Sequence, residues 1–145
     1  MDKNHTTFEN FQLLEERLIP SSSYLFFYEN AFLKINLIKE ITSKQSLPIL
    51  YVDLDFLFSG YVKSKLLTIP NLTLFSTLES KINEILPKIF TKLATKPHFV
   101  IFDSINGLYN TLSNDVDSGR LVNSILMLLA RNISFSNSIL IVSAL

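Results

Sequence analysis

Short, almost purely apolar runs separated by helix-like segments are the feature that most constrains the fold of this chain. The most apolar runs cover residues 47–52, 99–102 and 139–145. Strands of a parallel sheet are buried on both faces and therefore read as nearly continuous hydrophobic runs. A membrane-spanning helix needs roughly 18 apolar residues in a row, far more than any of these runs contains. We therefore expect buried strands and no association with a membrane.

Strands and helices are expected to alternate along the chain. Apolar runs predict strands over residues 24–28, 49–54, 71–75, 98–103 and 138–144. Apolar residues at helical spacing predict helices over 32–42, 78–93 and 118–132. Pro87 should bend or divide the second of these helices, and Gly60 and residues 113–118 are the expected loops. This alternation predicts an α/β fold with a mainly parallel sheet and helices on both faces.

Composition fits one domain without a disulfide framework. The 145 residues include no cysteine, and 13 basic residues balance 13 acidic ones. We expect an amphipathic N-terminal segment over residues 1–18, followed by a single core over 19–145. The polar start of the chain does not resemble a secretory signal, so we expect a cytoplasmic protein. The balanced charge provides no general attraction to nucleic acid, so any DNA contact should be local or made through a partner.

Four segments carry recognisable patterns in a fixed order. They are IPSSSYLFF at 19–27, YVDLD at 51–55, FVIFDS at 99–104 and ILIVS at 139–143. In this order and spacing they resemble the RecA/RadA/KaiC-like superfamily of ATPase cores, over residues 19–145. The resemblance implies a RecA-like sheet, either in a minimal form or truncated at its C-terminus, in which the last strand lies between the first strand and the 99–103 strand.

The resemblance also implies roles for three polar residues at strand ends. Asp103 falls on the Walker B carboxylate that holds Mg²⁺ through water. Asp55 falls on the acid that orients the attacking water in the family, although it is one methylene shorter than the usual glutamate. Ser143 falls on the polar residue that senses the γ-phosphate. The alternative for Asp103, and for Asp53 with Asp55, is that these residues simply begin the turns after their strands.

The phosphate-binding loop departs from the family pattern. Aligned without gaps, residues 28–35 (YENAFLKI) place Lys34 on the lysine of G-x-x-x-x-G-K-[ST]. Tyr28 and Leu33 replace the two glycines, and Ile35 replaces the hydroxyl that binds Mg²⁺. Side chains at the glycine positions would occupy the space of the phosphates. The sequence therefore predicts a degenerate loop, with the alternative that Lys34 is only a solvated helix residue.

These patterns favour a non-hydrolysing RecA-like protein, a scaffold or accessory subunit in DNA recombination or repair. Its expected partner is another RecA-fold protein or a further copy of itself, and no cofactor is expected. One alternative is an atypical ATPase that uses ATP and Mg²⁺ with Lys34, Asp55 and Asp103. Another is an unrelated flavodoxin- or receiver-like domain with an acidic pocket. Finally, Phe56, Phe58 and Tyr61 follow the second strand closely, and we expect this aromatic loop to bind a partner.

Overall fold

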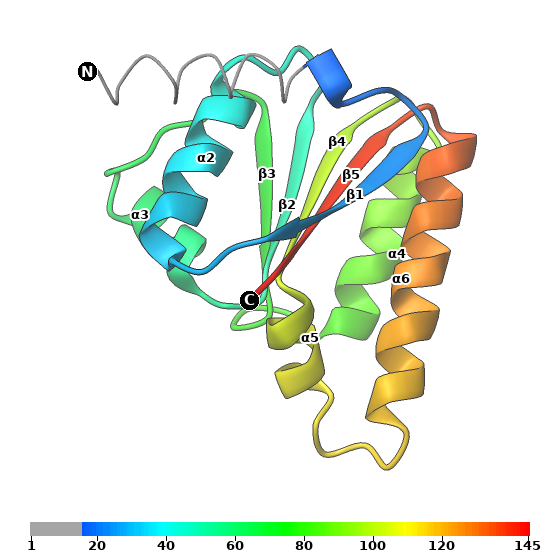
Figure 1. The fold of residues 1–145 in the computed structure, drawn as a ribbon. Helices are drawn as coiled ribbons and strands as arrows, with labels where there is room; N and C mark the ends of the chain where they lie inside the picture. The colour runs from blue at the N-terminus through cyan, green and yellow to red at the C-terminus, as the bar shows by residue number, and fades with distance from the viewer. Residues whose placement is uncertain (1–15) are drawn as a thin grey trace.

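The computed structural model describes residues 16–145. Five strands and five helices longer than one turn follow one another in that part of the chain (Figure 1). In chain order they are β1 (Ser22–Phe27), α2 (Ala31–Ser43), β2 (Ile49–Asp53), α3 (Leu57–Lys63), β3 (Leu72–Ser76), α4 (Ile82–Leu93), β4 (Phe99–Asp103), α5 (Ile105–Thr111), α6 (Ser118–Phe135) and β5 (Ile139–Ala144). Every expected strand is present, with ends shifted by at most two residues.

The strands form one parallel sheet in the order β1-β5-β4-β2-β3. Strand β5 therefore lies between β1 and β4, as the resemblance implied. Every residue of β2, β4 and β5 is buried, which explains why these strands read as continuous apolar runs. The order differs from the flavodoxin-like order 2-1-3-4-5, so the flavodoxin- or receiver-like alternative is wrong.

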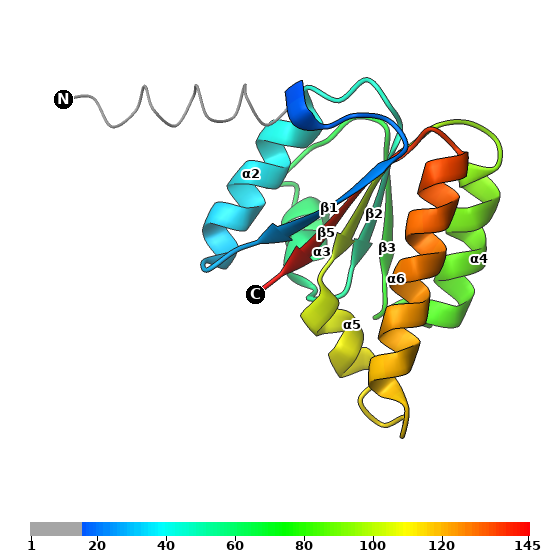
Figure 2. The same ribbon diagram turned by 45° about the vertical axis from the view of Figure 1, so that its right-hand side comes forward.

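Helices cover both faces of the sheet, as expected. Helices α2 and α3 lie on one face, and α4 and α6 lie on the other (Figures 1 and 2). Alternate strand residues point to opposite faces, so the core has two layers. Ile49, Tyr51 and Ile101 pack on the α2 side, whereas Val52 and Phe102 pack on the α4 and α6 side.

Apolar spacing accounts for the long helices. In α4 the buried residues are Ile82, Ile85, Ile89 and Leu93, which fall on one stripe facing the sheet. Pro87 lies within this helix and its side chain is exposed. Pro87 was expected to bend or divide this helix; it does not divide it, because α4 continues on both sides of Pro87. Its ring lies away from the core, and proline removes only one donor from the helical hydrogen bonds.

Two short helices were not expected. Helices α3 and α5 each have seven residues, too few for apolar periodicity to reveal them. Gly60, an expected loop residue, lies inside α3. Residues 113–117 do form the connection before α6, as expected.

The N-terminal segment expected over residues 1–18 lies mostly outside the described residues. Of its apolar residues, Leu18 is described and packs against the core layer under α2. Within residues 16–145, no helix combines the length and apolar content that crossing a bilayer requires.

Candidate functional site

The sequence-derived site residues meet at the carboxyl ends of the strands, where α/β sheets bind their ligands. Lys34 comes from the first turns of α2, Asp55 from the connection after β2, Asp103 from the end of β4 and Ser143 from β5. Hydrogen bonds link all four side chains, with Asp103 receiving two of them directly. The structure therefore brings together residues that lie up to 109 positions apart in the chain.

Asp103 is the centre of this group and is fully buried. Its Oδ1 accepts hydrogen bonds from Lys34 Nζ at 2.7 Å and from Ser143 Oγ at 2.6 Å. Its Oδ2 accepts from the Tyr51 hydroxyl at 2.5 Å. Three side chains from three elements thus satisfy one carboxylate, as a buried charge requires.

Lys34 is buried with only 1% of its surface exposed, so the alternative of a solvated helix residue is wrong. Its ammonium also lies 3.4 Å from Asp55 Oδ2 and 4.3 Å from the centre of the Tyr28 ring. Burial by itself would lower the pKa of Lys34, but the hydrogen bond to Asp103 and the charge of Asp103 outweigh it. The pKa of Lys34 is therefore raised above its ordinary value, and the ammonium stays charged.

Asp55 is the more open of the two carboxylates that face Lys34, with 24% of its side chain exposed. Its Oδ2 also lies 3.4 Å from the Tyr28 hydroxyl, a long contact. On its other side, α5 approaches closely at Gly107, where an added Cβ would lie 2.5 Å from Asp55 Oδ1. Glycine at this position thus allows α5 to approach the segment that carries Asp55.

Asp53 forms a separate contact two residues earlier. Its Oδ2 accepts from the backbone N–H of Ser59, at 2.6 Å, and from the Ser59 hydroxyl, which ties β2 to α3. Its Oδ1 is buried and has no hydrogen-bond partner among the described residues. Burial raises the pKa of Asp53, and the hydrogen bonds from Ser59 offset this only in part. Asp53 is thus the last residue of β2 and contacts α3, whereas Asp55 lies in the turn after the strand and also joins the site.

The connection between β1 and α2 has only three residues, Tyr28 to Asn30. Asn30 caps the helix, and its side-chain oxygen accepts from the backbone N–H groups of Phe32 at 2.8 Å and Leu33 at 3.3 Å. The first N–H groups of a helix are the ones available to bind an anion. Here the chain's own Asn30 side chain already occupies two of them.

The aromatic residues after β2 do not form one exposed loop. Phe56 is 43% exposed, as expected for a contact residue. Phe58 is completely buried and stacks on Tyr51 with ring centres 3.7 Å apart, and Tyr61 is half-buried against the same core layer. The expectation that Phe58 is available at the surface is wrong, because α3 turns it into the core.

Sequence reasoning missed Tyr51 and Tyr28 as members of the site. Tyr51 lies two residues before the end of β2, as Ile101 does before Asp103 on the paired strand β4, so the alternation of side chains places Tyr51 on the face of Asp103. That spacing is the signal by which the sequence could have identified Tyr51. Burial raises the pKa of the Tyr51 hydroxyl well above its ordinary value, and the charge and hydrogen bond of Asp103 raise it further. Among residues 16–145, no group of three His, Cys, Asp or Glu side chains is arranged to hold a metal ion.

Comparisons with known proteins identify the architecture. No family model and no curated protein matches the chain. Among solved structures, the RadB recombinase superposes with a TM-score of 0.61 at 17% identity, over 88% of this chain and 62% of that one. The fold is RecA-like.

A second RecA-like neighbour agrees with this identification. It is a KaiC-like protein from Pyrococcus horikoshii OT3, with a TM-score of 0.57 at 12% identity, over 86% of this chain and 61% of that one. This chain thus spans about three fifths of the length of each neighbour. Lys34 lies at the start of α2, and Asp103 and Ser143 lie at the ends of the adjacent strands β4 and β5.

Proposed function

We propose that this RecA-like chain does not hydrolyse ATP and serves as a scaffold subunit that pairs with a RecA-fold partner. The observation that carries the proposal is the buried ion pair between Lys34 and Asp103, 2.7 Å long. The same two residues are those expected to bind phosphate and metal in an active ATPase core. In this chain they neutralise each other.

Mg²⁺ does not fit beside this pair. A divalent cation at Asp103 would approach an ammonium that already lies within hydrogen-bond distance of the same oxygen, and like charges at such distances repel strongly in a buried site. It would also have to displace donors from a carboxylate that accepts three hydrogen bonds. Metal binding therefore requires that the buried network open first.

The phosphates of ATP fit no better. A phosphate-binding loop wraps its anion with successive free backbone N–H groups, usually supported by glycine. The three-residue connection contains no glycine, and Asn30 occupies two N–H groups of α2. The connection therefore offers ATP no row of free backbone N–H groups.

DNA recombination or repair is the process we propose for this scaffold. The supporting observation is the likeness to a chain named RadB recombinase. Because the net charge of the chain is zero, contact with DNA would be supplied by the partner rather than by this domain.

Isothermal titration calorimetry with Mg²⁺–ATP tests the proposal. We expect no saturable heat for the parent chain at ATP concentrations up to about 1 mM, the upper end of the KM values typical of enzymes. Phosphate release should stay at the buffer background. The control is Lys39→Ala, a solvent-exposed lysine on the same helix.

Micromolar binding that Lys39→Ala retains but Lys34→Ala and Asp103→Ala lose would overturn the proposal. Circular dichroism must first show that both site variants are folded. In that case the chain would be an atypical ATP-binding protein that uses Lys34 and Asp103.

A further inference from the structure

A cleft opens at the carboxyl ends of the strands, between the turn after β2 and helix α5. Its volume is about 370 Å³, within the range of about 300–1,000 Å³ that is common for small-molecule sites. The residues that line it are Leu54, Asp55, Phe56, Gly107, Asn110 and Thr111. Lys34 and Asp103, which carry the proposed function, do not line this cleft, so it is a separate feature of the same edge of the sheet.

Asp55 supplies the cleft with negative charge. Two carboxylates, Asp55 and Asp103, face the single ammonium of Lys34, so these three side chains together carry one surplus negative charge. Asp103 is fully buried and accepts three hydrogen bonds. Asp55 Oδ2 has only long contacts, 3.4 Å each, and no group within residues 16–145 donates a hydrogen bond to Asp55 Oδ1. The surplus charge therefore lies on the open side of the network, where it favours a cation.

Phe56 adds an aromatic surface beside this charge. Its ring is 43% exposed, and its backbone has a φ of 66°, in the left-handed region that a bulky residue rarely adopts. Residues held in such conformations are frequent at ligand sites. A cation above the face of an aromatic ring is attracted by the quadrupole of the ring, and a planar cation also stacks on it.

The other polar groups of the cleft can accept hydrogen bonds. The Thr111 hydroxyl donates its proton to the backbone oxygen of Gly107 at 2.8 Å, so it offers only lone pairs to a ligand. Asn110 is exposed, and its amide oxygen is an acceptor as well. Together with Asp55 Oδ1, these acceptors suit a ligand rich in N–H donors. Amidinium and guanidinium groups are planar, charged and without acceptors.

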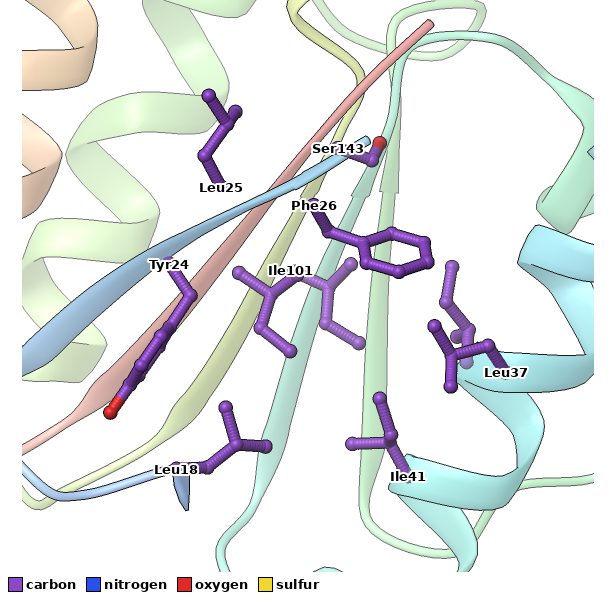
Figure 3. A pocket seen from close by; sticks show the side chains of 10 residues that line it. Leu18, Tyr24, Leu25, Phe26, Leu37, Ile41, Ile101 and Ser143 are labelled. Carbon is purple, nitrogen blue, oxygen red and sulfur yellow. The ribbon is translucent and has the colours of Figure 1, made fainter. Parts of the chain in front are cut away.

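A second cavity, of about 110 Å³ between β1 and α2, has a different character (Figure 3). Figure 3 shows Phe26 of β1 pointing toward Leu37 of α2 across this cavity. Its lining is apolar except for Tyr24 and Ser143, and the Ser143 hydroxyl already donates to Asp103. No charged side chain lines it, so it offers a cation no partner. It provides an internal comparison for the test below.

We propose that the cleft between α5 and the turn after β2 binds a small planar organic cation, an amidinium or a guanidinium. Asp55 Oδ1 accepts hydrogen bonds from the cation, and the Phe56 ring packs against its plane. Ca²⁺ does not fit this cleft, because it takes about six to eight oxygen ligands and the cleft has one carboxylate. The inference goes beyond the scaffold role and does not depend on it, because Asp55 faces Lys34 with its other oxygen.

An NMR titration of the ¹⁵N-labelled chain with benzamidinium tests this proposal. The backbone amide signals of residues 54–57 and 107–111 should shift saturably, with a dissociation constant of roughly 1–10 mM for so small a ligand. Benzamide is the neutral analogue of nearly the same shape, and it should bind at least about tenfold more weakly because it lacks the charge. Benzylammonium should also bind more weakly, since its tetrahedral group cannot direct two parallel N–H bonds at a carboxylate.

Two variants assign the binding to named side chains. Asp55→Asn keeps the shape and removes the charge, and it should raise the dissociation constant of benzamidinium at least about tenfold. Phe56→Ala should raise it about two- to fivefold. The matched controls are Glu84→Gln and Phe135→Ala, because both residues are exposed, lie on α4 and α6 and do not line the cleft. The ligand-free spectrum of each variant shows whether it is folded.

Several outcomes would overturn the inference. Equal affinities for benzamide and benzamidinium, or an unchanged affinity in folded Asp55→Asn, would mean that the charge of Asp55 does not bind the ligand. Equal binding of benzylammonium would remove the argument for a planar cation. Shifts confined to residues 24–26 and 37–41 would place the ligand in the apolar cavity of Figure 3 instead. The absence of saturable shifts at about 50 mM benzamidinium, above the expected dissociation constant, would reject the site itself.

Discussion

Replacing Lys34 with methionine removes the ammonium from the buried Asp103 carboxylate and keeps a side chain of similar length. Asp103 then retains two hydroxyl donors, from Tyr51 and Ser143, but no positive charge. Removing one partner of a buried ion pair typically costs about 3–5 kcal/mol, because the other charge stays buried without compensation. The pair here is 1% and 0% exposed, so solvent screens little of this cost.

Urea denaturation followed by circular dichroism measures this effect. A loss of about 3–5 kcal/mol corresponds to a fall in the urea midpoint of roughly 1.5–2.5 M, for an m-value of about 2 kcal/mol/M. Lys39→Met is the control, because Lys39 is exposed on the same helix and should change stability by less than about 0.5 kcal/mol. Adding Asp103→Asn to Lys34→Met removes both charges, and the double variant should lose less than the sum of the single losses.

Equal unfolding midpoints for Lys34→Met and Lys39→Met would refute this reasoning. They would mean that the ammonium is solvated and contributes no buried ion pair. A double variant whose loss equals the sum of the two single losses would refute it as well, since the two residues would then act independently.

Two further predictions concern the neighbours of this pair. Gly107→Ala should destabilise the protein by about 1–3 kcal/mol in the same urea assay, because the new Cβ would lie 2.5 Å from Asp55 Oδ1. Gly119→Ala is the control and should not destabilise the protein, because no atom lies within 4 Å of its new Cβ. Burial raises the pKa of Asp53 in the folded state. The folded protein therefore binds a proton at Asp53 more readily than the unfolded chain does. The free energy of unfolding should thus increase through Asp53 as the pH falls from neutral toward the unfolded pKa of 3.8. In Asp53→Asn that contribution should vanish, and a parent and variant with the same pH dependence of unfolding would contradict the assignment.

The sheet could be predicted from the sequence because its strands are buried on both faces. Their apolar runs are short, and their boundaries coincide with proline and polar residues. Helices α3 and α5 could not be predicted, since seven residues give fewer than two repeats of the helical period. The α5 helix does begin with a capping signal, because Ser104 Oγ accepts from the N–H of Gly107, but such a signal is common in loops.

Part of the membership of the site was predictable, and its geometry was not. Strand-end positions placed Asp103, Asp55 and Ser143 at one edge of the sheet, which the structure shows. The direct contact of Lys34 with Asp103 depends on where α2 lies relative to the carboxyl ends of the strands, and no local sequence pattern encodes that position. Exposure of Phe58 was predicted wrongly for a related reason: a residue shortly after a strand looks exposed until the next helix turns it inward.

The short connection after β1 explains why Lys34 faces a carboxylate. With three residues between β1 and α2, the helix starts close to the strand ends, and Lys34 lies in its first turns. Helical side chains lean toward the N-terminus of their helix, so the Lys34 ammonium points back toward Asp103. A charged ammonium is unfavourable near a helix N-terminus, and its burial is unfavourable as well. Asp103, Tyr28 and Asp55 together offset these costs, as the raised pKa of Lys34 indicates. Introducing glycines into this connection would therefore not be enough to create a phosphate site, because Lys34 would first have to leave Asp103.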